Sequence, residues 1–155
     1  MSDVLQYEGK RVIVTGAASG MGAATAQILV DLGAEVHAID IKKPEVTGLA
    51  SFSQCDLRDP AQIDETVAKI GKIVNALFNC AGLPQTAAAM DVMKVNFIST
   101  RHLTDRVLPL MSAGSAIVIG PFTGCGMGLG ARMESSSRCP RRTTWPIAPS
   151  DSLIS

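Results

Sequence analysis

The chain has 155 residues, which corresponds to one domain of ordinary size. Its 14 basic and 14 acidic residues give a formal net charge of zero, which argues against nucleic acids and anionic membrane surfaces as partners. Apolar residues make up 46% of the chain, and no apolar run approaches the roughly 18 residues of a membrane span, so we expect a globular cytoplasmic protein.

From residue 10 to residue 119, short apolar runs alternate with longer stretches of helical periodicity. The apolar runs predict five strands, the third of them the weakest, over residues 10–15, 35–40, 51–54, 73–79 and 115–119. The periodic stretches predict helices over residues 21–32, 60–70 and 91–108. Strands that are almost wholly apolar and alternate with helices indicate a parallel sheet covered on both faces, and hence the α/β class.

Local signals mark the ends of these elements. Asp59 followed by Pro60 is typical of an N-cap and a first helical residue, and Gly33 is a suitable residue to end the first helix. Pro109 stops the third helix, and the pair Ala113-Gly114 leads into the last strand.

The composition changes after Ile119. Residues 120–130 contain five glycines, and residues 131–155 contain six serines, three prolines and four arginines without an apolar period. Such a stretch cannot bury enough surface to offset its ordering entropy, so we expect it to be disordered. The predicted organisation is therefore a folded domain over residues 1–119 and a tail over residues 120–155.

The cysteines and histidines indicate no metal site. The cysteines form no C-x-x-C pair and have no histidine at ligand spacing, so we expect free thiols at Cys55, Cys80, Cys125 and Cys139. His37 and His102 have no partner in the sequence and are expected to be ordinary strand and helix residues.

A glycine-rich turn, Thr15-Gly16-Ala17-Ala18-Ser19-Gly20-Met21-Gly22, joins the first predicted strand to the first helix. Gly16 permits the tight turn, Gly20 lets the backbone approach a pyrophosphate, and Gly22 lets the helix pack against the sheet. Unpaired N–H groups at the helix start favour phosphates. The turn therefore predicts phosphate binding by Gly16, Ser19, Gly20, Met21 and Gly22, with a purely structural turn as the alternative.

Asp40 ends the second predicted strand, 18 residues beyond Gly22. A carboxylate there can accept hydrogen bonds from both ribose hydroxyls of an adenosine and would repel a 2′-phosphate. Lys42 and Lys43 would soften this exclusion of NADP, but Asp40 is the better-placed group. The sequence therefore predicts NAD as the cofactor, with a solvated carboxylate at a strand end as the alternative.

These motifs resemble those of the short-chain dehydrogenase/reductase family. Residues 15–22 match its T-G-x-x-x-G-x-G, Asn79-Cys80-Ala81-Gly82 is similar to its N-N-A-G, and Cys55-Asp56-Leu57 resembles its (C/V)-D-(V/L). Val95-Asn96 falls in the long predicted helix, where the family has V-N. The resemblance covers residues 8–119, the first half of a typical member. It implies a Rossmann-type doubly wound parallel sheet with strand order 3-2-1-4-5, here without its C-terminal strands.

The resemblance also implies a role for each matching residue. The side chain of Asp56 would bind the adenine amino group, and Leu57, Asn79, Ala81 and Gly82 would lie beside the cofactor. Asn96 would distort its helix and hold a water of the catalytic proton relay. The alternatives are a turn-former at Asp56, a strand cap at Asn79 and a solvent-facing side chain at Asn96.

One connection indicates a branch of the family. Only 13 residues separate Gly82 from Asn96, and Ala81-Gly82-Leu83-Pro84 matches an A-G-x-P sequence. Both features are similar to the branch that contains 3α-hydroxysteroid dehydrogenase/carbonyl reductase and the coniferyl-alcohol dehydrogenases.

The family transfers hydride between a secondary alcohol or carbonyl and nicotinamide, with a tyrosine as general acid/base whose pKa is lowered by a lysine four residues on. No Tyr-x-x-x-Lys occurs in this chain, because the single tyrosine, Tyr7, precedes the first strand and the last lysine is Lys94. Thr123 is a candidate for the serine or threonine that holds the substrate oxygen.

The sequence thus predicts an NAD-dependent oxidoreductase for a small alcohol or ketone, represented by its cofactor-binding half. A catalytically silent dinucleotide-binding module or an inert fragment is the alternative. The change in composition near residue 120 indicates a truncation or a change of reading frame in a gene for a full enzyme. The missing half would carry the family's usual homo-oligomer interfaces.

Overall fold

The computed structural model describes residues 5–71 and 73–119. One parallel sheet, with strand order β3-β2-β1-β4-β5, forms its centre. Its strands are β1 (Arg11–Thr15), β2 (Glu35–Asp40), β3 (Ser51–Gln54), β4 (Val74–Asn79) and β5 (Met111–Ile119). The predicted α/β class, parallel sheet and strand order are confirmed.

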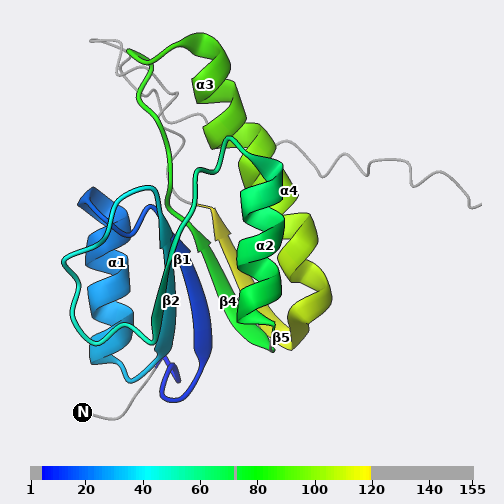
Figure 1. Ribbon diagram of the computed structural model, residues 1–155. Coiled ribbons are helices and arrows are strands. Elements are labelled where there is room, and N and C mark those ends of the chain that lie inside the picture. Colours follow the sequence, from blue (N-terminus) through cyan, green and yellow to red (C-terminus); the bar gives the residue numbers. More distant parts are fainter. Residues whose placement is uncertain (1–4, 72, 120–155) are drawn as a thin grey trace, which may run out of the picture.

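Helices cover both faces of this sheet (Figure 1). Helix α1 (Gly20–Asp31) lies on one face, and α2 (Pro60–Ile70) and α4 (Thr100–Val107) lie on the other. The predicted helix over 91–108 is a continuous helical stretch of four parts: α3 (Ala89–Met93), a π-helical segment η1 (Lys94–Ser99), α4, and a 3-10 turn η2 (Leu108–Leu110). None of the helices in the described part of the chain is long and apolar enough to cross a membrane.

The predicted start of α2 and the predicted end of α1 are confirmed, whereas Pro109 does not stop the third predicted helix but lies in the 3-10 turn that follows α4. The Asp59 carboxylate accepts a hydrogen bond from the Ala61 N–H at 3.0 Å and caps α2, with Pro60 in its first turn. After α1, Gly33 adopts a φ of +80°, a left-handed conformation that favours glycine, and its N–H donates to the Val30 carbonyl at 2.9 Å.

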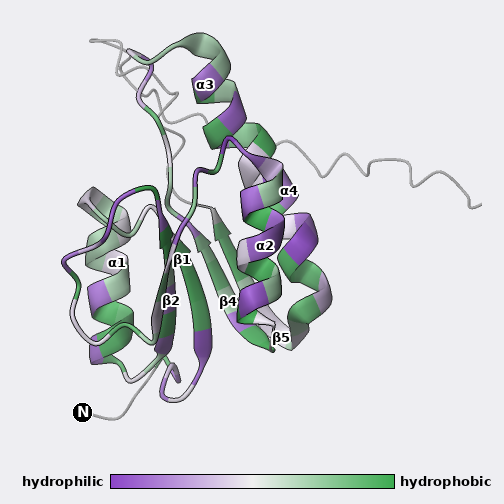
Figure 2. Cartoon of the chain, in the orientation of Figure 1, coloured by the Kyte–Doolittle hydropathy of each residue, from purple (hydrophilic) through white to green (hydrophobic). Residues whose placement is uncertain are grey.

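The core has two parts, one on each face of the sheet. On the α1 face, Val12 and Val14 of β1 pack with Ala26 and Leu29 of the helix. On the other face, Ile13 of β1 and Leu77 of β4 pack with buried side chains of α2 and α4, among them Leu103. Figure 2 shows the strands as predominantly hydrophobic, as a sheet buried on both faces requires.

The last strand begins four residues earlier than predicted, at Met111 instead of residue 115. The step of two residues from Val74 to Ala76 in β4 pairs with a step of five residues from Met111 to Ala116 in β5, so the extra residues of β5 bulge out of the ladder. Gly114 permits this bulge with a φ of +86°, and Ser115 donates a hydrogen bond to the Val74 carbonyl. The pair Ala113-Gly114 therefore lies inside the strand and does not precede it.

Strand β5 forms one edge of the described sheet, and its Ile117 and Val118 are exposed. The predicted disordered tail, residues 120–155, lies outside the described residues, as do Thr123, Cys125 and Cys139.

The packing of α4 can be tested with two leucines. Leu103 is 1% exposed in the core, whereas Leu108 is 55% exposed. Leu103→Ala is expected to lower the free energy of unfolding by about 2–5 kcal/mol, because it leaves a cavity between α4 and the sheet. Leu108→Ala should change it by less than about 0.5 kcal/mol. Urea denaturation measures both, and equal losses would contradict this placement of α4.

Candidate functional site

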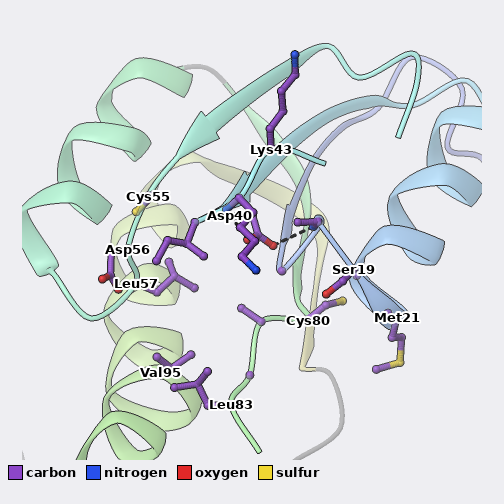
Figure 3. A pocket seen from close by; sticks show the side chains of 18 of the residues that line it. Ser19, Met21, Asp40, Lys43, Cys55, Asp56, Leu57, Cys80, Leu83 and Val95 are labelled. Atoms are coloured by element: carbon purple, nitrogen blue, oxygen red, sulfur yellow. Dashed lines mark hydrogen bonds between the residues drawn. The ribbon is translucent and has the colours of Figure 1, made fainter. Parts of the chain in front are cut away.

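A cavity of about 800 Å³ opens at the carboxyl ends of the parallel strands (Figure 3). The turns after β1, β2, β3 and β4 line it, because parallel strands bring these turns to one edge of the sheet. Ten of the eleven predicted cofactor residues meet there: Gly16, Ser19, Gly20, Met21, Gly22, Asp40, Asp56, Leu57, Ala81 and Gly82.

The three glycines of the turn after β1 have different structural roles. A Cβ on Gly16 would lie 2.7 Å from the Cα of Ala81, and a Cβ on Gly22 would lie 2.1 Å from the carbonyl oxygen of Gly16. Both positions therefore need glycine for close backbone packing. A Cβ on Gly20 would have nothing within 4 Å, so the turn leaves open space at that point.

The start of α1 is suited to an anion. Ser19 is its N-cap, and its side chain makes no capping hydrogen bond. The first turn of α1 contains no acidic residue. The first N–H groups of a helix lack partners within the helix, and its dipole places partial positive charge there. This end of the helix faces the cavity, so it can hold a phosphate.

Thr15, which sequence reasoning did not single out, joins the turns after β1 and β4. Its side chain is buried, and its Oγ1 accepts a hydrogen bond from the Ala81 N–H at 3.0 Å. A hydroxyl at the end of an otherwise apolar strand is the signal that could have identified it, because a buried hydroxyl needs a partner.

Asp40 ties the turn after β1 to the end of β2. Its Oδ2 accepts a hydrogen bond from the Ala18 N–H at 2.9 Å, and its Oδ1 accepts one from the Lys42 N–H at the same distance. A carboxylate has about four lone-pair sites, so both oxygens can still accept further hydrogen bonds from the cavity. Figure 3 shows that the Lys43 side chain extends away from Asp40.

Asp56 follows β3 and is held by Arg58, a second residue that sequence reasoning missed. Arg58 Nη2 lies 2.7 Å from Asp56 Oδ2, and the Arg58 backbone N–H donates to Asp56 Oδ1 at 2.9 Å. These hydrogen bonds hold the pKa of the Asp56 carboxyl below its usual range. The Leu57 N–H, beside this carboxylate, has no acceptor among the residues described here.

Asn79 is the predicted cofactor residue that does not line the cavity. It is 5% exposed, and its Nδ2 lies 3.5 Å from Thr104 Oγ1 of α4. Residues of a strand point alternately to the two faces of its sheet, and the side chain of Asn79 lies on the face that α4 covers.

Asn96 lies in the π-helical segment and clamps the turn after β4. Its Oδ1 accepts a hydrogen bond from the Leu83 N–H at 2.7 Å, and its Nδ2 donates to the Leu83 carbonyl at 3.0 Å. The prediction that this helix is distorted at Asn96 agrees with the π-helical turn. The alternative of a side chain that only faces solvent is wrong.

Three further reactive side chains in the described part of the chain, Tyr7, Cys80 and His102, each have neighbours of their own. Tyr7 packs against Phe78, with ring centroids 6.3 Å apart, and does not line the cavity. Burial raises the pKa of the Cys80 thiol, so it stays protonated and is a poor nucleophile. His102 pairs with Asp64 across α4 and α2 at 2.9 Å.

Known proteins are similar to this chain over most of its length. A model of the short chain dehydrogenase family matches residues 10–130, which continues past Ile119. Coniferyl-alcohol dehydrogenase from Pseudomonas sp. (strain HR199 / DSM 7063) is 38% identical over 114 residues, or 74% of this chain and 44% of that protein. The 3-alpha-hydroxysteroid dehydrogenase/carbonyl reductase of Comamonas testosteroni is 37% identical, over 70% of this chain and 42% of that protein.

Solved structures of dehydrogenases are also similar to this chain. The ligand-free aldohexose dehydrogenase of Thermoplasma acidophilum aligns with a TM-score of 0.64 and 26% identity, over 72% of this chain and 48% of that chain. A short chain dehydrogenase/reductase of Burkholderia phymatum, solved in complex with NAD, aligns with a TM-score of 0.59 and 26% identity, over 68% and 45%. This chain spans less than half the length of the two curated relatives described above. The chain belongs to the short chain dehydrogenase family.

Proposed function

We propose that the cavity binds NAD(H), and that the chain is the cofactor-binding half of an oxidoreductase of the kind that transfers hydride between a secondary alcohol or carbonyl and nicotinamide. One observation carries this proposal: the start of α1, the Asp40 carboxylate and the residues Asp56 and Leu57 after β3 line a single cavity. The dehydrogenases named above and the relative solved with NAD support it.

The residues fit each part of the cofactor. The start of α1 and the space at Gly20 would hold the pyrophosphate, and Asp40 would accept hydrogen bonds from the adenosine ribose. The Asp56 carboxylate is an acceptor and the Leu57 N–H is a donor, which complement the amino group and the ring N1 of adenine. Ala81 and Gly82 would lie beside the nicotinamide half, which supplies the hydride chemistry when bound.

The same residues favour NAD over NADP. A 2′-phosphate on the ribose would meet the Asp40 carboxylate, which two backbone N–H groups hold in place. Lys42 and Lys43 also line the cavity and would attract a phosphate, but their charges lie at the ends of flexible side chains. The fixed negative charge of Asp40 therefore decides the preference.

A second candidate function is a dinucleotide-binding module without catalysis. The family's proton transfer needs a tyrosine and a lysine beside the substrate, and the single tyrosine of these 155 residues is Tyr7, which packs against Phe78 outside the cavity. Both functions share the cofactor site, and they differ in turnover.

Cofactor preference tests the role of Asp40. NADH is expected to bind the full chain at least about tenfold more tightly than NADPH, and Asp40→Asn should reduce this ratio to near one, because it removes the repelling charge. Isothermal titration calorimetry measures both affinities. Asp105→Asn, which removes an exposed carboxylate outside the cavity, is the control and should leave the ratio unchanged. Tighter binding of NADPH than of NADH would contradict the role of Asp40.

Turnover separates the two candidate functions. We expect the purified 155-residue chain to bind NADH but to show no oxidation or reduction above background with a panel of secondary alcohols and ketones. The absorbance of the reduced nicotinamide, measured in a spectrophotometer, follows the reaction. Turnover above background would establish that the chain is an oxidoreductase and would reject the silent module. If NADH did not bind, both candidate functions would be rejected and the chain would be an inert fragment.

The Asn96 clamp can be tested without catalysis. Asn96→Ala removes both hydrogen bonds to Leu83, a residue of the cavity wall. Amide hydrogen exchange at Leu83 should become about tenfold faster or more, and NADH affinity should fall about threefold to tenfold. Thr100→Ala, which removes a hydroxyl bonded to the Asn96 carbonyl, is the matched control. Unchanged exchange at Leu83 would refute the clamp.

A further inference from the structure

At the edge of the cavity, the Arg58 side chain donates hydrogen bonds to both carboxylate oxygens of Asp56. Its Nε lies 3.0 and 3.1 Å from the two carboxylate oxygens, and its Nη2 lies 2.7 Å from Oδ2. Its backbone N–H adds a fourth hydrogen bond, to Oδ1 at 2.9 Å. A guanidinium bound to both oxygens fixes the plane of a carboxylate as well as its charge.

The turn that carries this pair is itself anchored on two sides. The Asp56 N–H donates to Gln62 Oε1 of α2 at 2.9 Å, and the Asp59 N–H donates to the Asp56 carbonyl at 3.0 Å. Arg58 Nη1 also lies 3.5 Å from Asp91 Oδ2 of α3, so the arginine links the turn to a second helix. The carboxylate is therefore held before any ligand enters.

This edge of the cavity has a defined hydrogen-bonding pattern. Asp56 is ionised beside Arg58, so it accepts hydrogen bonds and cannot donate one. The neighbouring Leu57 N–H can only donate. Adenine matches both groups, because its amino group donates and its ring N1 accepts. Hypoxanthine matches neither group, because its carbonyl, in place of the amino group, would face the Asp56 acceptor and its N1–H would face the Leu57 N–H donor.

We propose that Arg58 is the positioning residue that sets the base selectivity of this cavity. By holding Asp56 as a fixed acceptor, it favours a dinucleotide of adenine over the same dinucleotide of hypoxanthine. The inference depends on the NAD(H) site proposed above, and it adds a residue that controls which base that site accepts.

The test compares two cofactors on the full chain. NADH and reduced nicotinamide hypoxanthine dinucleotide differ only in the base edge that Asp56 and Leu57 would contact. Calorimetry on the unmodified chain should give at least about tenfold tighter binding of NADH, and Arg58→Gln should reduce this ratio to about threefold or less, mainly through weaker NADH binding. Arg58→Lys, which keeps the charge but cannot contact both oxygens, should give a ratio between these two.

Two further variants complete the test. Arg101→Gln removes an exposed arginine whose partner is Asp105, outside the cavity, and should keep the original ratio. Asp56→Asn should abolish the preference, because an amide can also donate a hydrogen bond. An arginine that only stabilised the fold would weaken both dinucleotides by the same factor when replaced, and the ratio would not move.

The outcomes separate this inference from the proposed function. The role of Arg58 is wrong, while the NAD(H) site stands, if the unmodified chain binds both dinucleotides equally. The same holds if either Arg58 variant keeps the affinity ratio of the unmodified chain. If NADH does not bind at all, the proposed function fails, and the inference fails with it.

Discussion

The site is organised around one pair of residues, Thr15-Gly16, which we call the joint. The Gly16 N–H donates to the Ile39 carbonyl of β2 at 2.9 Å, and Thr15 Oγ1 accepts from the Ala81 N–H beyond β4 at 3.0 Å. The backbone of Gly16 also approaches Ala81 so closely that no side chain fits between them. One dipeptide therefore holds the ends of three neighbouring strands together, and the cavity forms where they meet.

This joint also fixes the direction of the turn that follows. The carbonyl of Gly16 lies against Gly22, so the first turn of α1 packs on the end of β1. Asp40 then binds the Ala18 N–H from the β2 side. Where the chain bends at this buried joint, its backbone N–H groups and its hydroxyl need hydrogen-bond partners from neighbouring segments, because an unpaired buried hydrogen-bonding group costs about 1–3 kcal/mol. The same hydrogen bonds that satisfy this requirement place the helix start and the carboxylate beside one another.

The sequence predicts the parts that depend on local chemistry. Apolar runs located the strands, the Asp59-Pro60 pair located the start of α2, and the glycine spacing located the turn at the cavity. It could not predict features that depend on tertiary neighbours. The bulge at Gly114 depends on the length of β4 opposite it, and the partner of the Asn79 side chain depends on where α4 places Thr104. Likewise, the role of Arg58 becomes visible only when its guanidinium is seen on both oxygens of Asp56.

We propose that the ends of β1 to β4 form one preorganised dinucleotide site. The most direct measurement is the change in backbone amide NMR signals of the full chain on addition of NADH. The largest shifts are expected to occur together at Gly16, Ala18, Gly20, Leu57 and Ala81, at the carboxyl ends of the strands. Shifts confined to the amino ends of the strands, around Arg11 and Glu35, or no shifts at saturating NADH, would contradict it.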